Sequence, residues 1–126
     1  MDVQRHAGKS PYEGMYGFSR AVRVGDRILV AGTAPVPAPG SGLAPTAGAQ
    51  MERCVEIATQ AIESLGGTIG DVVRTRMFIV DADDADAVGR VHAAAFGEAA
   101  PVATMVVVAA LLDPGWRVEI EVEAIV

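Results

Sequence analysis

Residues 117–126 read RVEIEVEAIV. Every even-numbered position in this stretch is apolar, and positions 119, 121 and 123 are glutamates. Side chains of a β-strand alternate between its two faces, so the pattern predicts a strand with one apolar and one acidic face. The apolar face must pack against other elements, and the carboxylates of Glu119, Glu121 and Glu123 gather on the opposite face.

The residues before this strand predict further strands and two helices. Short runs rich in β-branched residues predict strands over Ala21–Val24, Arg27–Ala31, Asp71–Val80 and Thr104–Ala109. Apolar residues spaced by three and four predict helices over Thr46–Leu65 and Asp83–Phe96. The order β-β-α-β-α-β-β indicates an α+β fold with a mixed sheet and both helices on one face. Because the Thr104–Ala109 strand is almost wholly apolar, we expect both of its faces to be covered.

The whole chain, residues 1–126, is predicted to form a single domain. A chain of 126 residues has an ordinary single-domain length. Pro35–Gly48 is rich in proline, glycine and alanine, which predicts an exposed loop within the domain. Met1–Ser10 is polar and does not resemble a secretory signal. No apolar stretch is long enough for a membrane helix.

The composition favours an oligomer in the cytoplasm. Apolar residues make up 51% of the chain. One small interior does not easily bury that share, so we expect part of it to lie at a subunit interface. Cys54 is the only cysteine and falls on the apolar face of a predicted helix. It forms no intrachain disulfide, which favours a cytoplasmic protein with a buried structural thiol.

Charge and spacing argue against several classes of function. The net charge is −6, and lysines and arginines form no run. Nucleic-acid binding is therefore disfavoured, because phosphate contacts supply most of the affinity of such proteins. His6, His92 and Cys54 are too far apart for a metal-binding spacing. The glycine-rich segments match no phosphate-binding pattern, so we expect no metal and no cofactor.

Four segments together resemble the RidA family, also called YjgF or endoribonuclease L-PSP. They are the hairpin end Val30–Thr33, the run DVVRTRMFIVDADDADAV from Asp71 to Val88, the strand that follows Pro101, and the closing VEIEVEAIV. The resemblance extends from about Phe18 to Val126 and rests on the order and spacing of these segments.

The resemblance implies a chorismate-mutase-like fold and a homotrimer with three pockets between subunits. Characterised members hydrolyse reactive imines and enamines of amino acids to keto acids and ammonia. In those deaminases an arginine binds the substrate carboxylate, and a glutamate of the last strand acts on the water molecule of the hydrolysis. A tyrosine and a serine line the pocket.

One of those four groups is present in this chain. The glutamate falls on Glu121, whereas the arginine falls on Ala103, the serine on Ala31 and the tyrosine on Phe18. A carboxylate buried without its cationic partner costs roughly 3–5 kcal/mol. Ala103 is thus the decisive departure from the deaminases.

The resemblance also implies which residues surround the ligand. The predicted ligand-binding residues are Phe18, Ala31, Gly32, Thr33, Ala103, Thr104 and Glu121. Burial in such a pocket would raise the pKa of Glu121 and make it a usable base. The alternative is that Glu121 belongs to a solvated strand face with Glu119 and Glu123.

Other polar residues leave their roles open at this stage. Arg20, Arg76 or Arg90 would replace the missing cation if one of them reached the pocket, but a surface arginine that stabilises the fold is the simpler interpretation. His92 lies at the edge of a predicted helix's apolar face, where a partly buried structural histidine is favoured over a catalytic one. For Trp116, which follows a turn, packing is the simpler interpretation.

Three hypotheses about function follow. The first is a RidA-like homotrimer that binds a small metabolite between subunits and lacks activity on 2-iminopropanoate and 2-iminobutanoate. The second is an imine or enamine deaminase, or another small-molecule hydrolase, that uses Glu121 as its catalytic residue. The third is a structural or protein-interaction module without a defined cavity. Neither nucleic acid nor a membrane is an expected partner.

Overall fold

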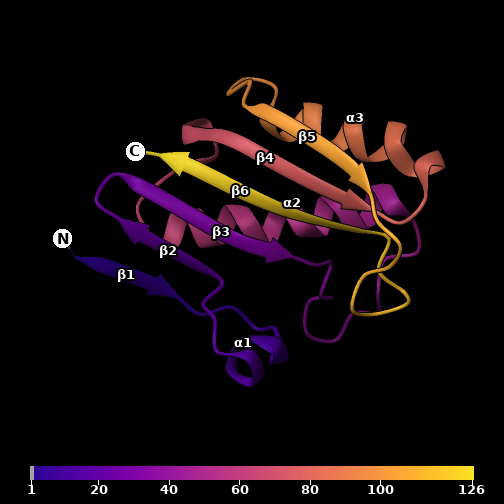
Figure 1. Cartoon of the computed structure of the whole chain (residues 1–126), viewed down its shortest axis with the longest axis horizontal. Helices are drawn as coiled ribbons and strands as arrows, with labels where there is room; N and C mark the ends of the chain where they lie inside the picture. Colours follow the sequence, from indigo (N-terminus) through magenta and orange to yellow (C-terminus); the bar gives the residue numbers. More distant parts are fainter. Residues whose placement is uncertain (1) are drawn as a thin grey trace.

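The computed structural model describes residues 2–126 and contains a six-stranded sheet with the order β1-β2-β3-β6-β4-β5 (Figure 1). The strands are β1 Val3–His6, β2 Ala21–Val24, β3 Arg27–Thr33, β4 Val72–Ile79, β5 Val102–Val107 and β6 Val118–Ile125. The helices are α1 Pro11–Tyr16, α2 Ala47–Ser64 and α3 Ala85–Phe96, with 3-10 turns at Ile69–Asp71 and Ala82–Asp84. Neighbouring strands are antiparallel except β4 and β5, which are parallel.

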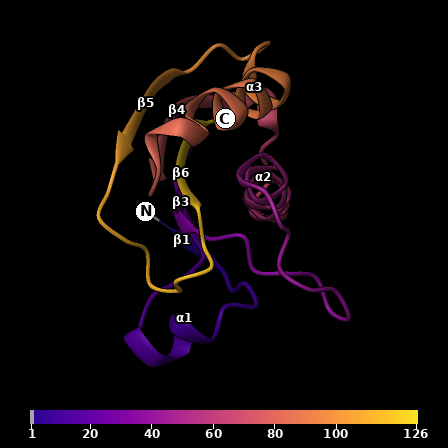
Figure 2. The same cartoon turned by 90° about the vertical axis from the view of Figure 1, so that its right-hand side faces the viewer.

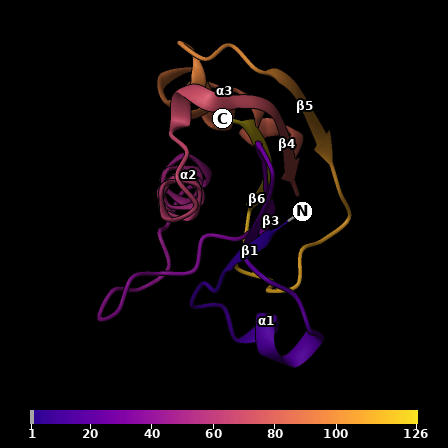
Figure 3. The ribbon, with the colours of Figure 1, turned by 90° about the vertical axis from the view of Figure 1, so that its left-hand side faces the viewer.

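Helices α2 and α3 cover one face of the sheet, and the other face is open (Figures 2 and 3). The apolar residues of β6, among them Ile120 and Val122, are buried against the helices together with Ile28 and Met51. The glutamates of β6 lie on the open face, as strand alternation requires. The predicted α+β fold and the predicted faces of the last strand are confirmed.

Helix α2 begins and ends close to the predicted positions. Thr46 is its N-cap, and the Thr46 hydroxyl accepts a hydrogen bond from the Ala49 amide. Beyond the C-cap residue Leu65, Gly66 adopts a left-handed φ of 88° that a glycine tolerates best. Cys54 lies on the buried side of this helix, so the prediction of a structural thiol agrees with its position.

The N-terminal segment contains two elements that the predicted order lacks. Strand β1 pairs with β2 and extends the sheet by one strand. Helix α1 follows Ser10, whose hydroxyl accepts a hydrogen bond from the Tyr12 amide, while the Glu13 carboxylate accepts one from the Ser10 amide. This capping box, followed by Pro11 at the first helical position, is a sequence signal for a helix start.

Strand β5 differs from its prediction in position and in burial. It spans Val102–Val107, two residues earlier than expected, and lies at the edge of the sheet. Val102 and Val107 are 60% and 56% exposed, and only Met105 packs against the core. The expectation that both faces of this strand are covered is therefore wrong within one subunit. In the described part of the chain, no helix is long and apolar enough to span a membrane.

Candidate functional site

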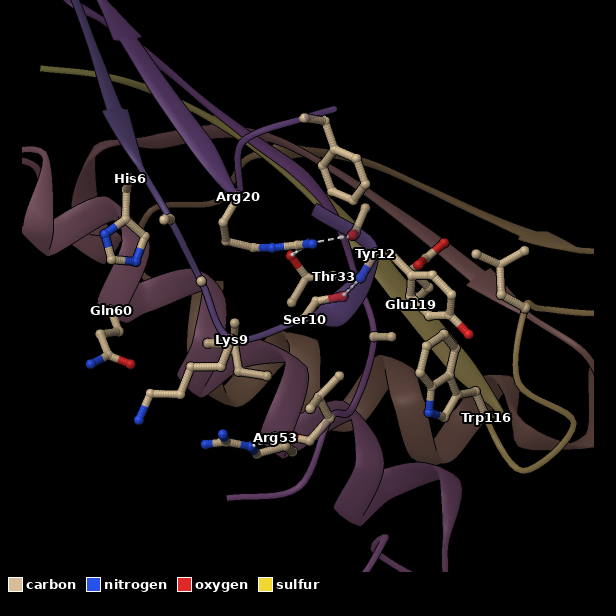
Figure 4. A pocket seen from close by; sticks show the side chains of 18 of the residues that line it. His6, Lys9, Ser10, Tyr12, Arg20, Thr33, Arg53, Gln60, Trp116 and Glu119 are labelled. Atoms are coloured by element: carbon tan, nitrogen blue, oxygen red, sulfur yellow. Dashed lines mark hydrogen bonds between the residues drawn. The ribbon is translucent and has the colours of Figure 1, made fainter. Parts of the chain in front are cut away.

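A cavity of about 180 Å³ opens at the end of the sheet, where α1, the end of β3, α2 and the segment before β6 meet (Figure 4). Its walls include Tyr12, Phe18, Arg20, Gly32, Trp116 and Glu119. Polar and aromatic side chains thus converge on one enclosed space, which is typical of small-molecule sites.

A buried ion pair builds the wall that α1 contributes. Glu13 Oε2 lies 3.3 Å from Arg20 Nε, and both side chains are less than a tenth exposed. The other carboxylate oxygen, Glu13 Oε1, accepts a 2.8 Å hydrogen bond from the Gly8 amide. The polar atoms of Glu13 are therefore satisfied on several sides, as a buried charge requires.

The same arginine reaches across to β3. Arg20 Nη1 donates to the Gly32 carbonyl and, at 3.2 Å, to the Thr33 hydroxyl. The Arg20 guanidinium also lies 5.4 Å from the centre of the Phe18 ring. Arg20 is thus a structural residue that joins the start of β2 to the end of β3, and it lines the cavity at the same time.

Glu119 is the carboxylate that faces the cavity. Gly32 allows its close approach, because a Cβ added at Gly32 would stand 3.2 Å from the Glu119 carboxyl carbon. Burial raises the pKa of Glu119 above its usual value, the positive charge of Arg20 opposes that rise in pKa, and Glu121 adds to it. A half-buried carboxylate with a raised pKa is able to hold a proton or a hydrogen-bond donor.

The aromatic wall comes from α1 and from the segment before β6. The Tyr12 and Trp116 rings meet edge to face with centres 6.1 Å apart, and Tyr12 also stacks on Tyr16 at 5.6 Å. Gln50 of α2 fixes the segment that carries Trp116, since its side chain accepts a hydrogen bond from the Arg117 amide and donates one to the Gly115 carbonyl. Trp116 is therefore held in place from both sides.

The structure divides the predicted site residues into two groups. Phe18, Gly32 and Thr33 line the cavity. Ala31 lines a separate shallow hollow over β2 and β3, which Phe18 also borders. Of the predicted site residues, then, only three meet in this cavity.

The remaining predicted residues lie outside the cavity, towards β5. Glu121 forms a 3.3 Å ion pair with Arg76, and both side chains are 40% exposed. In the strand register, Arg76 of β4 lies opposite Glu121 of β6 on one side and Thr104 of β5 on the other. The side chains of Glu121, Arg76 and Thr104 therefore form a row across the open face. Ala103 is exposed, but its register partner on β4 is the buried Thr75, so this pair points to the face that the helices cover. Within one subunit, the carboxylate that lines the cavity is Glu119, not Glu121, and the pocket predicted around Glu121 between two subunits stays a prediction.

The other polar candidates have structural positions. His92 Nε2 lies 2.7 Å from the buried Thr75 hydroxyl, beneath the sheet, and burial lowers the pKa of His92. Arg90 is paired with Asp86 on the exposed side of α3. Neither lines the cavity, so the preference for a structural histidine agrees with the geometry.

Three features of the cavity are not predicted from the sequence pattern. The pattern does not indicate helix α1, packing is the simpler interpretation of Trp116, and the resemblance selects Glu121 instead of Glu119. The capping box at Ser10 and Glu13 would have revealed α1, which carries Tyr12. The choice between the two glutamates depends on the approach of Gly32, a contact between distant parts of the chain that strand alternation does not indicate.

Comparison with known proteins identifies the family. The model of the family described as endoribonuclease L-PSP matches residues 9–126. The chain belongs to the RidA (YjgF, endoribonuclease L-PSP) family. The crystal structure of a Mycobacterium tuberculosis member of the YjgF/YER057c/UK114 family, Rv2704, is 41% identical and has a TM-score of 0.89, covering 99% of this chain and all of that chain (100%).

Two curated relatives support this membership of the RidA family. An uncharacterised protein of Streptomyces coelicolor is 38% identical over 97% of this chain and 91% of its own length. A 2-iminobutanoate/2-iminopropanoate deaminase of Salmonella typhimurium is 30% identical over 86% of this chain and 84% of its own length. The family assignment made from the sequence is confirmed.

Proposed function

We propose that this RidA-family protein is a homotrimer that binds a small metabolite between its subunits and does not hydrolyse 2-iminopropanoate or 2-iminobutanoate efficiently. The observation that carries the proposal is that the charged side chains around Glu121 on the open face are already paired with one another. The position of the deaminase arginine is Ala103, and the nearby arginines already have acidic partners.

The ion pairs of Arg76 argue against Arg76 as the replacement for the missing arginine that would bind the substrate carboxylate. Arg76 Nη1 lies 3.3 Å from Glu121 and 3.7 Å from Glu123. Arg74 lies 3.9 Å from Glu123. A substrate carboxylate would have to displace one of these glutamates, and it would meet two like charges there. Losing the anchor costs roughly 3–5 kcal/mol, which is about two to four orders of magnitude in affinity.

Exposed apolar residues on β5 and the open face support the homotrimer. Val102, Val106 and Val107 of β5 and Leu29 of β3 are all exposed in a single subunit. Exposed apolar side chains that cluster along one strand, as the three valines of β5 do, are typical of an interface between proteins. The resemblance to the RidA family, in which trimers form pockets between subunits, makes further copies of this chain the natural partners.

One observation favours an alternative function, an imine or enamine deaminase that uses Glu121. Arg76 is the only candidate cation of the three that lies beside Glu121, at 3.3 Å. The similarity to the Salmonella typhimurium deaminase points the same way. In this alternative Arg76 releases Glu121 and Glu123 when the substrate binds.

A coupled imine assay separates the two functions. An amino-acid oxidase generates 2-iminopropanoate or 2-iminobutanoate, and semicarbazide traps the imine that remains. We expect the protein to leave semicarbazone formation nearly unchanged, while the Salmonella typhimurium deaminase at equal concentration suppresses it. Equal suppression by the two proteins would contradict the proposal and favour the deaminase.

Sedimentation equilibrium tests the assembly independently of the chemistry. We expect a mass close to three times the 13.0 kDa of one subunit at micromolar concentration. A monomer at that concentration would exclude pockets between subunits, whatever the outcome of the imine assay.

A further inference from the structure

Strand β3 is irregular where it passes the cavity. Its register against β6 shifts between Val30 and Thr33, so that Ala31 and Gly32 together face a single residue of β6. Such a β-bulge leaves backbone groups outside the ladder of hydrogen bonds and bends the strand locally, which is how bulges redirect residues beside functional sites. The groups that bond the bulge therefore decide where Gly32 lies.

Arg20 bonds this bulge with its backbone and with its side chain. The Arg20 carbonyl accepts a 2.8 Å hydrogen bond from the Ala31 amide. Arg20 Nη1 donates to the Gly32 carbonyl and to the Thr33 hydroxyl, and the Thr33 hydroxyl donates in turn to the Ala31 carbonyl at 2.8 Å. One buried arginine thus satisfies polar groups of three consecutive residues of β3.

Gly32 is the residue of the bulge that meets β6. A Cβ added at Gly32 would stand 3.2 Å from the carboxyl carbon of Glu119 and 3.3 Å from its Oε2. The Glu119 carboxylate therefore lies directly against the Gly32 backbone, and a displacement of Gly32 would move this carboxylate or open a gap beside it. The side chains of Arg20, Thr33 and Glu119 can be followed along the cavity in Figure 4.

The charge of Arg20 also acts on Glu119. Burial raises the pKa of Glu119, the positive charge of Arg20 lowers it, and the negative charge of Glu121 raises it. On the neighbouring elements, β4 places the uncharged Phe78 opposite Glu119, and the α1 carboxylate of Glu13 is already paired with Arg20. The other ionisable side chains along the cavity are His6, Lys9, Tyr12, Tyr16 and Arg53. Arg20 is therefore the cation through which the protein interior favours an ionised Glu119.

We propose that Arg20 is a positioning residue of the cavity: it fixes the bulge of β3 and, through Gly32, holds the ionised Glu119 carboxylate at the cavity wall. Arg20 acts through these two residues, because its own guanidinium is committed to Glu13, Gly32 and Thr33. This inference rests on the proposed function, since a bound metabolite is what would meet the wall that Arg20 positions.

NMR of the ligand-free protein tests both parts of this role. One signal is the carboxyl carbon of Glu119, identified by its loss in Glu119→Gln. The other is the NOE between the Gly32 α protons and the Glu119 γ protons. Glu13→Leu/Arg20→Met removes the arginine without leaving a buried charge unpaired. We expect an upward shift of the Glu119 titration midpoint and a loss of the NOE. An ion pair that only stabilised the fold would not move that midpoint.

Two further variants separate charge from geometry. Arg20→Lys keeps the positive charge, but one ammonium group lacks the planar fork that serves three partners together. We expect Arg20→Lys to keep the Glu119 midpoint close to that of the wild type and to lose the NOE. Asp86→Leu/Arg90→Met is the matched control, because it removes an exposed ion pair on α3 by the same kind of substitution. It should change neither signal.

Two results would overturn the role of Arg20. An intact NOE in Arg20→Lys would show that Gly32 meets Glu119 without the arginine fork, and this test stands even if the double variant fails to fold. A Glu119 midpoint in Glu13→Leu/Arg20→Met equal to that of the α3 control would show that the charge of Arg20 does not act on this carboxylate. Neither measurement uses a ligand, so failure of this inference is distinct from failure of the proposed function, which the imine assay and sedimentation detect.

Discussion

Glu13 and Arg20 form a buried ion pair, with Glu13 Oε2 3.3 Å from Arg20 Nε, that ties helix α1 to the sheet. Arg20 continues the connection to β3 through the Gly32 carbonyl and the Thr33 hydroxyl. A helix of six residues is too short to be stable alone, so its position depends on such tertiary contacts. The Glu13–Arg20 pair therefore holds Tyr12 against Trp116 and shapes the cavity.

Removing one partner of this ion pair should destabilise the protein strongly. Glu13→Ala leaves the Arg20 charge buried and uncompensated, and we expect the free energy of unfolding to fall by roughly 3–5 kcal/mol. Urea unfolding measures this change. The double variant Glu13→Leu/Arg20→Met should lose less than Glu13→Ala does, because it buries no unpaired charge.

A surface pair provides the control for that experiment. Asp86 and Arg90 lie 2.8 Å apart on α3, but both side chains are 79% exposed. Asp86→Ala should leave urea unfolding essentially unchanged, because solvent screens exposed pairs. If Glu13→Ala unfolded at the same urea concentration as Asp86→Ala, the Glu13–Arg20 pair would not anchor α1.

Two glycines should respond oppositely to alanine. Gly66 has a φ of 88°, and a Cβ there would stand 2.8 Å from Nη1 of Arg23, which donates to the Leu65 carbonyl. We expect Gly66→Ala to lower the free energy of unfolding by roughly 1–2 kcal/mol, or more if Arg23 loses its bond. Gly14→Ala in α1 should raise stability by about 0.5–1 kcal/mol, since alanine loses less entropy in a helix.

Thermal unfolding of both glycine variants checks this. Within the described residues, no heavy atom lies within 4 Å of a Cβ added at Gly14, so the alanine there meets no obstacle. Equal melting temperatures for the two variants would show that neither the left-handed φ nor the contact with Arg23 limits position 66.

The alternation in residues 117–126 was sufficient to predict the faces of the last strand, because period-two patterning is local. It was not sufficient to choose among its three carboxylates, since all of them lie on one face. The register shift between Val30 and Thr33 on the neighbouring strand and the approach of Gly32 distinguish Glu119 from Glu121. Both arise from the pairing of distant segments.

The N-terminal elements escaped prediction for a different physical reason. Strand β1 is four residues long and almost wholly exposed, so it has no apolar face that patterning could reveal. Its pairing with β2 through backbone hydrogen bonds, not the burial of side chains, keeps it in the sheet. Without β1 and α1 in the predicted fold, the cavity wall that α1 contributes is not predicted either.

Restoring the deaminase arginine should not by itself create a deaminase. Ala103→Arg supplies a cation, but Phe18 and Ala31 still lack the hydroxyls that the resemblance to the deaminases assigns to these positions. We expect the semicarbazide assay to show at most a small gain for Ala103→Arg and a larger one for Phe18→Tyr/Ala31→Ser/Ala103→Arg. A single variant as active as the triple would show that the hydroxyls are dispensable here.

The partial burial of His92 should make stability depend on pH. Burial lowers the pKa of His92 below its ordinary 6.5 in the folded state, whereas in the unfolded chain the pKa returns to that value. Between the two pKa values the unfolded state binds more protons. Stability therefore rises with pH through this window and levels off above about 6.5.

Urea unfolding between about pH 5 and pH 8, compared with His92→Gln, isolates this contribution. We expect the wild type to gain stability relative to His92→Gln as the pH rises, because neutral His92 keeps its 2.7 Å hydrogen bond to the Thr75 hydroxyl. The comparison cancels other titrating groups, such as Glu119, whose raised pKa acts in the opposite direction. Parallel stability curves for the two proteins would mean that His92 titrates alike when folded and unfolded.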